Sequence, residues 1–213
     1  MFSLLVNSKQ IDMFLEMIKT MSISQKEMEK RFSFTNMEVY YDLEKKNKSI
    51  ALMCAHYASY EWVISMNYYT NFKGIGIYKK LANPYFDKLV KRIRSKFKAE
   101  LITTKETIST IENNYRNKVL SLYGFASDQS PKARSAYHWA PFMGPIVPVH
   151  TGAEMLAKRF DMNVIFLKVK KVKRGYYEAS FEILSEDAKS VPNYEITDKF
   201  LKLVEEQIYE APE

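Results

Sequence analysis

Segments that predict β-strands alternate with segments that predict helices along almost the whole chain. The alternation is typical of an α/β domain with a mixed, largely parallel central sheet flanked by helices. The 213 residues fit one domain, and no repeat or low-complexity linker divides them, so we expect residues 1–213 to form a single domain. Strands are predicted at 49–55, 74–78, 101–103, 119–125, 163–169 and 176–183.

The chain is predicted to open with an amphipathic helix. Ile11, Phe14, Leu15 and Ile18 follow the i, i+3, i+4, i+7 spacing of one helix face, and Ser8 before them is suited to the N-cap. Further helices are predicted at 25–31, after residue 36, at 59–69 and at 107–117.

Two later helices are predicted from their capping residues. Thr151 and Glu154 match a capping box that opens a helix ending near Phe160. Thr197 is suited to cap the last helix of the chain. The stretch between 141 and 148 contains three prolines and a glycine, which break up regular structure.

The clearest helix signal is Asn83-Pro84, with Asn as N-cap and Pro in the first turn. At 100° per residue, Arg94 lies at the margin of the apolar face of this helix, whereas Lys88, Lys91 and Arg92 point away from it. Arg94 is therefore the basic residue of this helix that is best placed to face a groove.

Cysteine and histidine usage excludes some classes of protein. A single cysteine, Cys54, excludes an intramolecular disulfide, and its spacing from His56, His138 and His150 matches no zinc motif. Cys54 in its predicted strand indicates a buried structural thiol rather than a nucleophile, since no neighbour in the sequence would lower its pKa. We expect no metal and no cofactor.

The formal net charge of +7 favours anionic partners, such as phospholipid headgroups, nucleic acid or an acidic carrier protein. No apolar run approaches the roughly 18 residues of a membrane span, and no signal peptide is recognisable. Basic and aromatic residues between Tyr78 and Phe97 are compatible with a nucleic-acid surface, but a solvated helix face is the commoner explanation. No Gly-rich phosphate loop or RNA-binding signature supports a nucleotide or nucleic-acid partner.

His56 follows the predicted strand 49–55, and Glu61 comes five residues later. This spacing suits a dyad in which a carboxylate orients an imidazole that takes a proton from a hydroxyl. The alternative is a hydrogen-bonded, half-buried histidine beside a surface glutamate, and the spacing alone does not separate the two.

Asp128 comes directly after another predicted strand, 119–125. Ligands of parallel sheets bind at the carboxyl ends of strands, so His56 and Asp128 are expected to share one site. The alternative is that Asp128 caps a turn. His138 and His150 have no acidic residue at a useful spacing and are interpreted as structural.

Several motifs occur in the order and approximate spacing found in the lipid A biosynthesis acyltransferases, the late lauroyl and myristoyl transferases. They are 56-HYASYE-61, 74-GIGIY-78, Asn83-Pro84 with Asp87, 92-RIR-94, Asp128-Gln129 and Thr151-Gly152. From about residue 10 to its end, the chain resembles this family of the lysophospholipid/glycerol-phosphate acyltransferase superfamily.

The resemblance implies a glycerol-phosphate acyltransferase-like fold and a His-x4-Glu mechanism, with His56 as general base and Glu61 as its orienting acid. It also implies that Arg94, Lys79 and Asp128 bind substrate. The donor would be an acyl thioester of acyl-carrier protein or coenzyme A, and the acceptor a hydroxyl of a lipid A precursor or related anionic glycolipid. The protein is expected at the membrane surface on the cytoplasmic face of the inner membrane.

The chain departs from the family pattern at three places. Lys79 stands where an arginine is usual, which keeps a phosphate contact but not a bidentate one. The family's N-terminal membrane helix and its closing Trp-x-His-Arg-Arg segment are not found in the sequence.

The alternatives to acyl transfer are a thioesterase that uses the same dyad with water, and a non-catalytic basic module for membrane or nucleic-acid surfaces.

Overall fold

The computed structural model describes residues 2–212, and side chains from residue 11 onward. Its main element is a seven-stranded sheet in the order β1-β9-β8-β2-β5-β3-β4, and β6 and β7 form a separate two-stranded hairpin. Neighbouring strands in the large sheet run parallel except β8 and β9, which are antiparallel. The strands are β1 (Phe32–Phe34), β2 (Ile50–Cys54), β3 (Lys73–Tyr78), β4 (Glu100–Thr103), β5 (Ser121–Ala126), β6 (His138–Pro141), β7 (Ile146–Val149), β8 (Asn163–Lys173) and β9 (Tyr176–Ser185).

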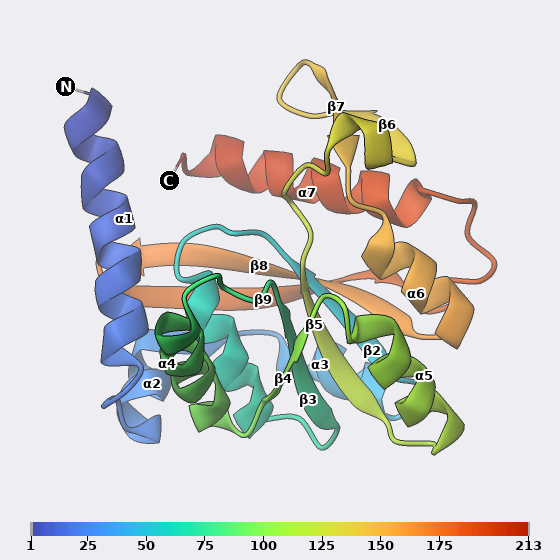
Figure 1. Cartoon of the computed structure of the whole chain (residues 1–213), viewed down its shortest axis with the longest axis horizontal. Helices are drawn as coiled ribbons and strands as arrows, with labels where there is room; N and C mark the ends of the chain where they lie inside the picture. The colour runs from blue at the N-terminus through green and yellow to red at the C-terminus, as the bar shows by residue number, and fades with distance from the viewer. Residues whose placement is uncertain (1, 213) are drawn as a thin grey trace.

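Helices surround the sheet, and α7 runs alongside β8 and β9 while α1 stands at one edge of the molecule (Figure 1). The α-helices are α1 (Phe2–Lys19), α2 (Gln25–Arg31), α3 (Met37–Glu44), α4 (Pro84–Arg94), α5 (Thr107–Arg116), α6 (Gly152–Phe160) and α7 (Glu195–Glu210). Three 3₁₀ segments complete the described chain, namely η1 (Tyr60–Tyr68), η2 (Ser95–Phe97) and η3 (Ala133–Ser135).

The central strand β2 is buried on both faces, which explains its continuous apolar sequence. Alternate side chains enter two different cores, as the period of two in a strand requires. Ala51 and Met53 join a core with residues of α5, α6 and α7. Leu52 and Cys54 join a second core with residues of α2, α3 and η1. The sheet is therefore covered by helices on both faces.

The predicted α/β class and the mixed, largely parallel sheet are confirmed. The segment 59–69 is helical but has 3₁₀ rather than α geometry. The hairpin of β6 and β7 was not predicted, because the prolines in this stretch mask its pattern. Pro141 and Pro148 lie in its strands, which is allowed because a two-stranded sheet consists only of edge strands.

The first helix differs from the prediction at its start. It begins at Phe2, so Ser8 lies within the helix and is not its N-cap; the side chain of Ser8 is outside the described residues. The predicted apolar face is present, but Ile11, Phe14 and Leu15 are exposed to solvent. The side chain that α1 buries in an apolar cluster is instead Met17, which packs near Val90 and Ile93 of α4.

The capping predictions are confirmed at Asn83 and wrong at residue 151. The Asn83 side chain accepts hydrogen bonds from the backbone N–H groups of Tyr85 and Phe86. Thr151 makes no capping hydrogen bond with its side chain. Glu154 faces the other way and accepts from the backbone N–H of Thr197 and from its hydroxyl, in the first turn of α7. Glu154 therefore links α6 to α7 instead of capping α6. The prediction that Thr197 caps α7 is also wrong, because the N-cap of α7 is residue 194.

Candidate active site

Three of the predicted site residues, His56, Asp128 and Lys79, lie at the carboxyl edge of the large sheet. The strands β2, β5 and β3 are neighbours and parallel, so their carboxyl ends lie side by side. His56 follows β2, Asp128 follows β5 and Lys79 follows β3. Cys54 and Ala126 are partners in the register, and the N–H of Ser127 donates to the carbonyl of Cys54 at 3.1 Å. The β2–β5 ladder therefore holds His56 and Asp128 face to face.

Asp128 contacts His56 through both of its carboxylate oxygens. Oδ1 lies 2.7 Å from the ring Nδ1 of His56, and Oδ2 accepts the backbone N–H of the same residue at 3.0 Å. A carboxylate only accepts hydrogen bonds, so Nδ1 carries the hydrogen and Nε2 of the neutral ring carries the lone pair. The His56 side chain is 31% exposed. The arrangement leaves an oriented proton acceptor that a substrate can reach.

Glu61 and Arg94 form a second charged pair. Arg94 Nε donates to Glu61 Oε2 at 2.9 Å, and an Arg94 Nη2 hydrogen bond to Oε1 completes a bidentate contact. Glu61 is 7% exposed and Arg94 22%, so the pair lies mostly below the surface. Burial disfavours the charge of Arg94, but the hydrogen bond and the charge of Glu61 outweigh it and raise the pKa of the guanidinium.

Tyr60 and Cys54 lie between the two pairs. The Tyr60 ring packs edge to face against the His56 ring, with centroids 4.8 Å apart. Burial and the neighbouring charge of Glu61 raise the pKa of Tyr60. Burial, followed by the charges of Asp128 and Glu61, raises the pKa of Cys54 to about 12. Cys54 is thus a protonated, structural thiol, as the sequence indicated, and sequence reasoning had missed Tyr60.

The contact expected between His56 and Glu61 is not formed in this structure. The hydrogen bond to the His56 ring comes from Asp128, and Glu61 binds Arg94 instead. The reason is local: η1 begins at Tyr60, and Glu61 in its first turn is buried toward α4. The part that each carboxylate plays in catalysis stays a prediction. The expected proximity of His56 and Asp128 is confirmed.

The remaining residues considered in the sequence are Lys79, predicted to bind substrate, and His138 and His150, interpreted as structural. Lys79 is exposed after β3. His138, interpreted as structural, has an acidic partner after all, since its Nε2 lies 2.7 Å from Oδ1 of Asp198 in α7. Burial lowers the pKa of His150. Within residues 2–212, no group of three or more His, Cys, Asp or Glu side chains is placed to hold a metal ion.

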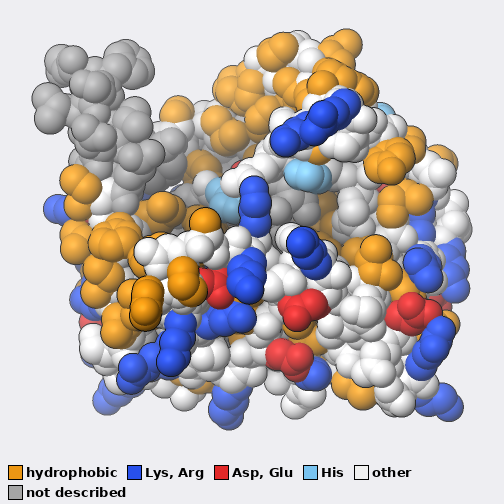
Figure 2. Space-filling view, viewed as in Figure 1, with side chains coloured by type: hydrophobic (Ala, Val, Ile, Leu, Met, Phe, Trp, Pro, Cys, Tyr) orange, Lys and Arg blue, Asp and Glu red, His pale blue; other side chains and the backbone are white. Residues whose placement is uncertain are grey.

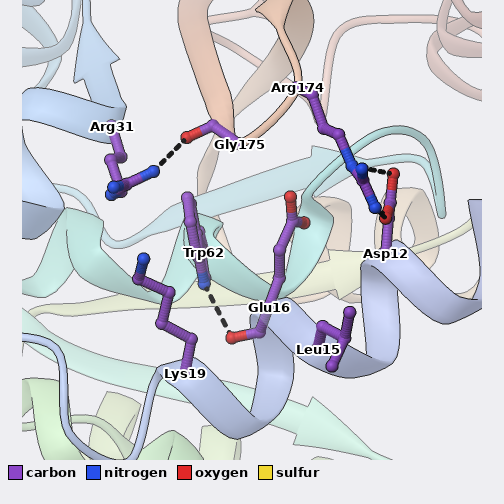
Figure 3. Close-up of a pocket in the computed structure, with 8 residues that line it drawn as sticks. All are labelled: Asp12, Leu15, Glu16, Lys19, Arg31, Trp62, Arg174 and Gly175. Atoms are coloured by element: carbon purple, nitrogen blue, oxygen red, sulfur yellow. Dashed lines mark hydrogen bonds and ion pairs between the residues drawn. The ribbon is translucent and has the colours of Figure 1, made fainter.

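A pocket of about 150 Å³ lies away from these groups, between α1 and the β8–β9 turn (Figure 3). Several of its charged side chains already have partners: Arg174 pairs with Asp12, and Arg31 donates to the carbonyl of Gly175. The ring N–H of Trp62 donates to the carbonyl of Glu16 at 3.3 Å. Asp12 and Glu16 thus link α1 to the β8–β9 turn and to η1, and none of the predicted site residues lines the pocket.

The family model of the bacterial lipid A biosynthesis acyltransferases matches residues 8–213. The chain belongs to this family. A comparison with curated proteins found no match.

Membership in the lipid A biosynthesis acyltransferases makes the protein an acyltransferase enzyme. The carboxyl edge of the sheet, where the His56 side chain is 31% exposed, is the candidate active site. None of the helices within the described chain is long and apolar enough to cross a membrane.

Proposed function

We propose that this lipid A acyltransferase moves a fatty acyl chain from an acyl thioester to a hydroxyl of a lipid A precursor or a related anionic glycolipid, with His56 as general base. The observation that carries the proposal is the His56–Asp128 pair, which leaves Nε2 as an accessible acceptor. The donor is acyl-carrier protein, with coenzyme A as the alternative carrier, and no cofactor takes part.

The reaction needs one proton to move twice. Nε2 of His56 takes the proton of the acceptor hydroxyl while the oxygen attacks the thioester carbonyl carbon. When the tetrahedral intermediate collapses, the carbon–sulfur bond breaks and the imidazolium returns the proton to the leaving thiolate. The products are an ester and a free thiol. Asp128 stabilises the transient imidazolium and keeps the ring in the required tautomer.

The roles of the two carboxylates follow from their contacts. Asp128 acts on the base, and Glu61 acts through Arg94, which it holds in one orientation by the bidentate contact. The guanidinium has five N–H donors, so those that Glu61 does not use remain for a lipid phosphate or the thioester carbonyl. Lys79 supplies a second cation for the acceptor from the end of β3.

The enzyme is proposed to work as a peripheral protein on the cytoplasmic face of the inner membrane. Two observations support attachment to an anionic membrane surface: the net charge of +7 and the exposed apolar face of α1 around Phe14. Attraction to anionic lipid contributes about 1 kcal/mol per Lys or Arg near the surface and is screened by salt. Cosedimentation with anionic vesicles at low salt is expected, and the part of it that depends on charge should weaken by about 0.5 M salt.

The decisive experiment incubates the protein with labelled acyl-carrier protein and a detergent-dispersed lipid A precursor. Acylated lipid supports the proposal. Free fatty acid in its place identifies a thioesterase, and neither product identifies a non-catalytic module. A parallel reaction with acyl-coenzyme A separates the two donors, because only the accepted carrier supports turnover.

A further inference from the structure

The β6–β7 hairpin has one face that consists only of apolar side chains. Trp139 and Pro141 alternate with buried or half-buried neighbours on β6, and the register pairs them with Pro148 and Ile146 on β7. Trp139 is 48% exposed and Ile146 69%. Tyr137, just before β6, is 83% exposed, and Met143 in the turn is also exposed. We call these six residues the hairpin face.

The opposite side of the hairpin is fixed to the protein. Ala140 and Val149 are buried in the core cluster that includes residues of α7. His138 contacts Asp198, and the backbone N–H of Met143 donates to Glu205 at 3.1 Å, which ties both ends of the hairpin to α7. The inner side of the hairpin is therefore held against α7, and the hairpin face points toward solvent.

The charged side chains in the segment that leads to the hairpin are all basic. No acidic residue occurs in the sequence between Asp128 and Glu154, whereas Lys132 and Arg134 lie exposed in the segment that leads to β6. The nearest acids on α7, Asp198 and Glu205, are bonded to the inner side. Figure 2 shows apolar side chains gathered over the hairpin, with basic side chains below them and histidines in the middle of the same face.

The hairpin and the candidate site lie on the same side of the sheet. The chain leaves the carboxyl end of β5 at Ala126, passes Asp128 and continues directly to β6 (Figure 1). We propose that the hairpin face inserts into the headgroup–acyl boundary of an anionic bilayer, beside the site. The inference deepens the proposed function, because a lipid acceptor would then be taken from the bilayer next to His56.

The composition of the hairpin face favours a bilayer over a protein partner. Tyr and Trp combine an apolar body with a polar tip and are enriched at membrane interfaces, and basic residues beside them attract anionic headgroups. Pro141 and Pro148 also lack the N–H groups that would be left without partners near lipid.

The two tryptophans of the chain provide a specific test. Trp62 is fully buried and Trp139 exposed, so a change in emission on adding vesicles reports Trp139. With phosphatidylglycerol vesicles, the emission should shift to the blue and be quenched by lipids labelled high on the acyl chain. Phosphatidylcholine vesicles should give a much weaker response. The Trp139→Phe variant, which retains Trp62, should show neither effect.

A pair of variants measures how much the hairpin face contributes to vesicle binding. Tyr137→Ser with Ile146→Ser should weaken partitioning by about tenfold or more, since two large apolar side chains no longer leave water. The control is Ile108→Ser with Val172→Ser, which removes two apolar side chains, each about half exposed, from other surfaces. Equal affinities of the two double variants would overturn the proposal.

Other outcomes also decide it. Sedimentation with vesicles without any change in Trp139 emission would assign the attachment to another surface, such as α1, and overturn the inference. A Trp139 response to an acidic carrier protein but not to vesicles would overturn it as well. The binding assay needs no turnover. Acyl transfer to detergent-dispersed lipid, without any Trp139 response to vesicles, would overturn this inference and leave the proposed function intact. A Trp139 response to vesicles without acyl transfer would support the inference and contradict the proposed function.

Discussion

Asp128 holds His56 at two points, accepting the backbone N–H through one carboxylate oxygen and facing ring Nδ1 through the other. The two residues are 72 positions apart in the chain. A two-point contact fixes the position of the residue as well as the tautomer of its ring. The imidazole therefore presents Nε2 outward without rearrangement, as a general base for a bulky lipid hydroxyl requires.

The first prediction concerns the base itself. His56→Ala should lower the turnover of acyl transfer by about 10²–10⁴-fold while the protein stays folded, because no other group replaces the proton acceptor. Initial rates with detergent-dispersed acceptor measure this. His138→Ala is the matched control, since it removes a histidine from the other His–Asp pair, and it should keep nearly normal turnover. Near-normal turnover of His56→Ala would refute the assignment.

The second prediction separates the two carboxylates. In Asp128→Asn, an amide N–H₂ that faces Nδ1 favours the ring with its hydrogen on Nε2, which removes the base, so turnover should fall by about 10²–10⁴-fold. Glu61→Gln keeps the His56–Asp128 contact and weakens the hold on Arg94. Its turnover should fall less, and rates of both variants at saturating substrate test the order. If Glu61→Gln has the larger effect, Glu61 rather than Asp128 supports the base.

The third prediction concerns Arg94. Arg94→Ala should weaken the binding of donor or acceptor, and Arg94→Lys should restore only part of it, because an ammonium cannot form the guanidinium fork. Arg94→Ala should also lower the free energy of unfolding by about 3–5 kcal/mol, since Glu61 would stay buried without its partner. Binding and urea denaturation measure the two effects. Unchanged affinity for both substrates would limit Arg94 to holding Glu61.

The fourth prediction is one of stability away from the site. Glu154 is fully buried, accepts from the N–H groups of Tyr194 and Thr197, and pairs with Lys158. Glu154→Ala should cost about 3–5 kcal/mol, because donors and a lysine lose their partner together. The control Glu112→Ala breaks an exposed pair with Arg116 and should cost about 0.3–0.5 kcal/mol. Urea denaturation that shows equal costs would contradict the role given to Glu154.

The fifth prediction follows from the pKa of Cys54, which burial raises to about 12. The folded state holds the thiol proton more tightly than the unfolded state, and this difference contributes to the free energy of unfolding. The contribution is complete below the ordinary thiol pKa and is lost as pH rises through the pKa of Cys54 in the folded protein. Above about pH 9, the parent should lose up to about 1.4 kcal/mol per pH unit relative to Cys54→Ala. Parallel pH dependence of the two proteins would show that the thiol is not buried. Alkylation by iodoacetamide at pH 8 should require unfolding.

The sequence by itself determined most of the helices and strands and their order, although not β1 or the β6–β7 hairpin. The period of apolar residues identified six strands of the large sheet, namely β2, β3, β4, β5, β8 and β9. The Asn83-Pro84 cap located α4. Strand ends also brought His56 and Asp128 to one edge, because parallel strands present their carboxyl ends together. These features depend on local propensity and on periodicity, which short stretches of sequence carry.

Only the tertiary structure decided how the side chains pair. Spacing suggested that Glu61 supports His56, but Glu61 is buried toward α4 and binds Arg94. The β2–β5 register instead places Asp128, 72 positions away, against the ring of His56. Likewise, Glu154 does not cap α6 but accepts a hydrogen bond from Thr197 of α7. The apolar spacing around Ile11 did not indicate that this face of α1 is exposed to solvent. Pairing and burial depend on the register and packing of segments far apart in the chain, which no local pattern encodes.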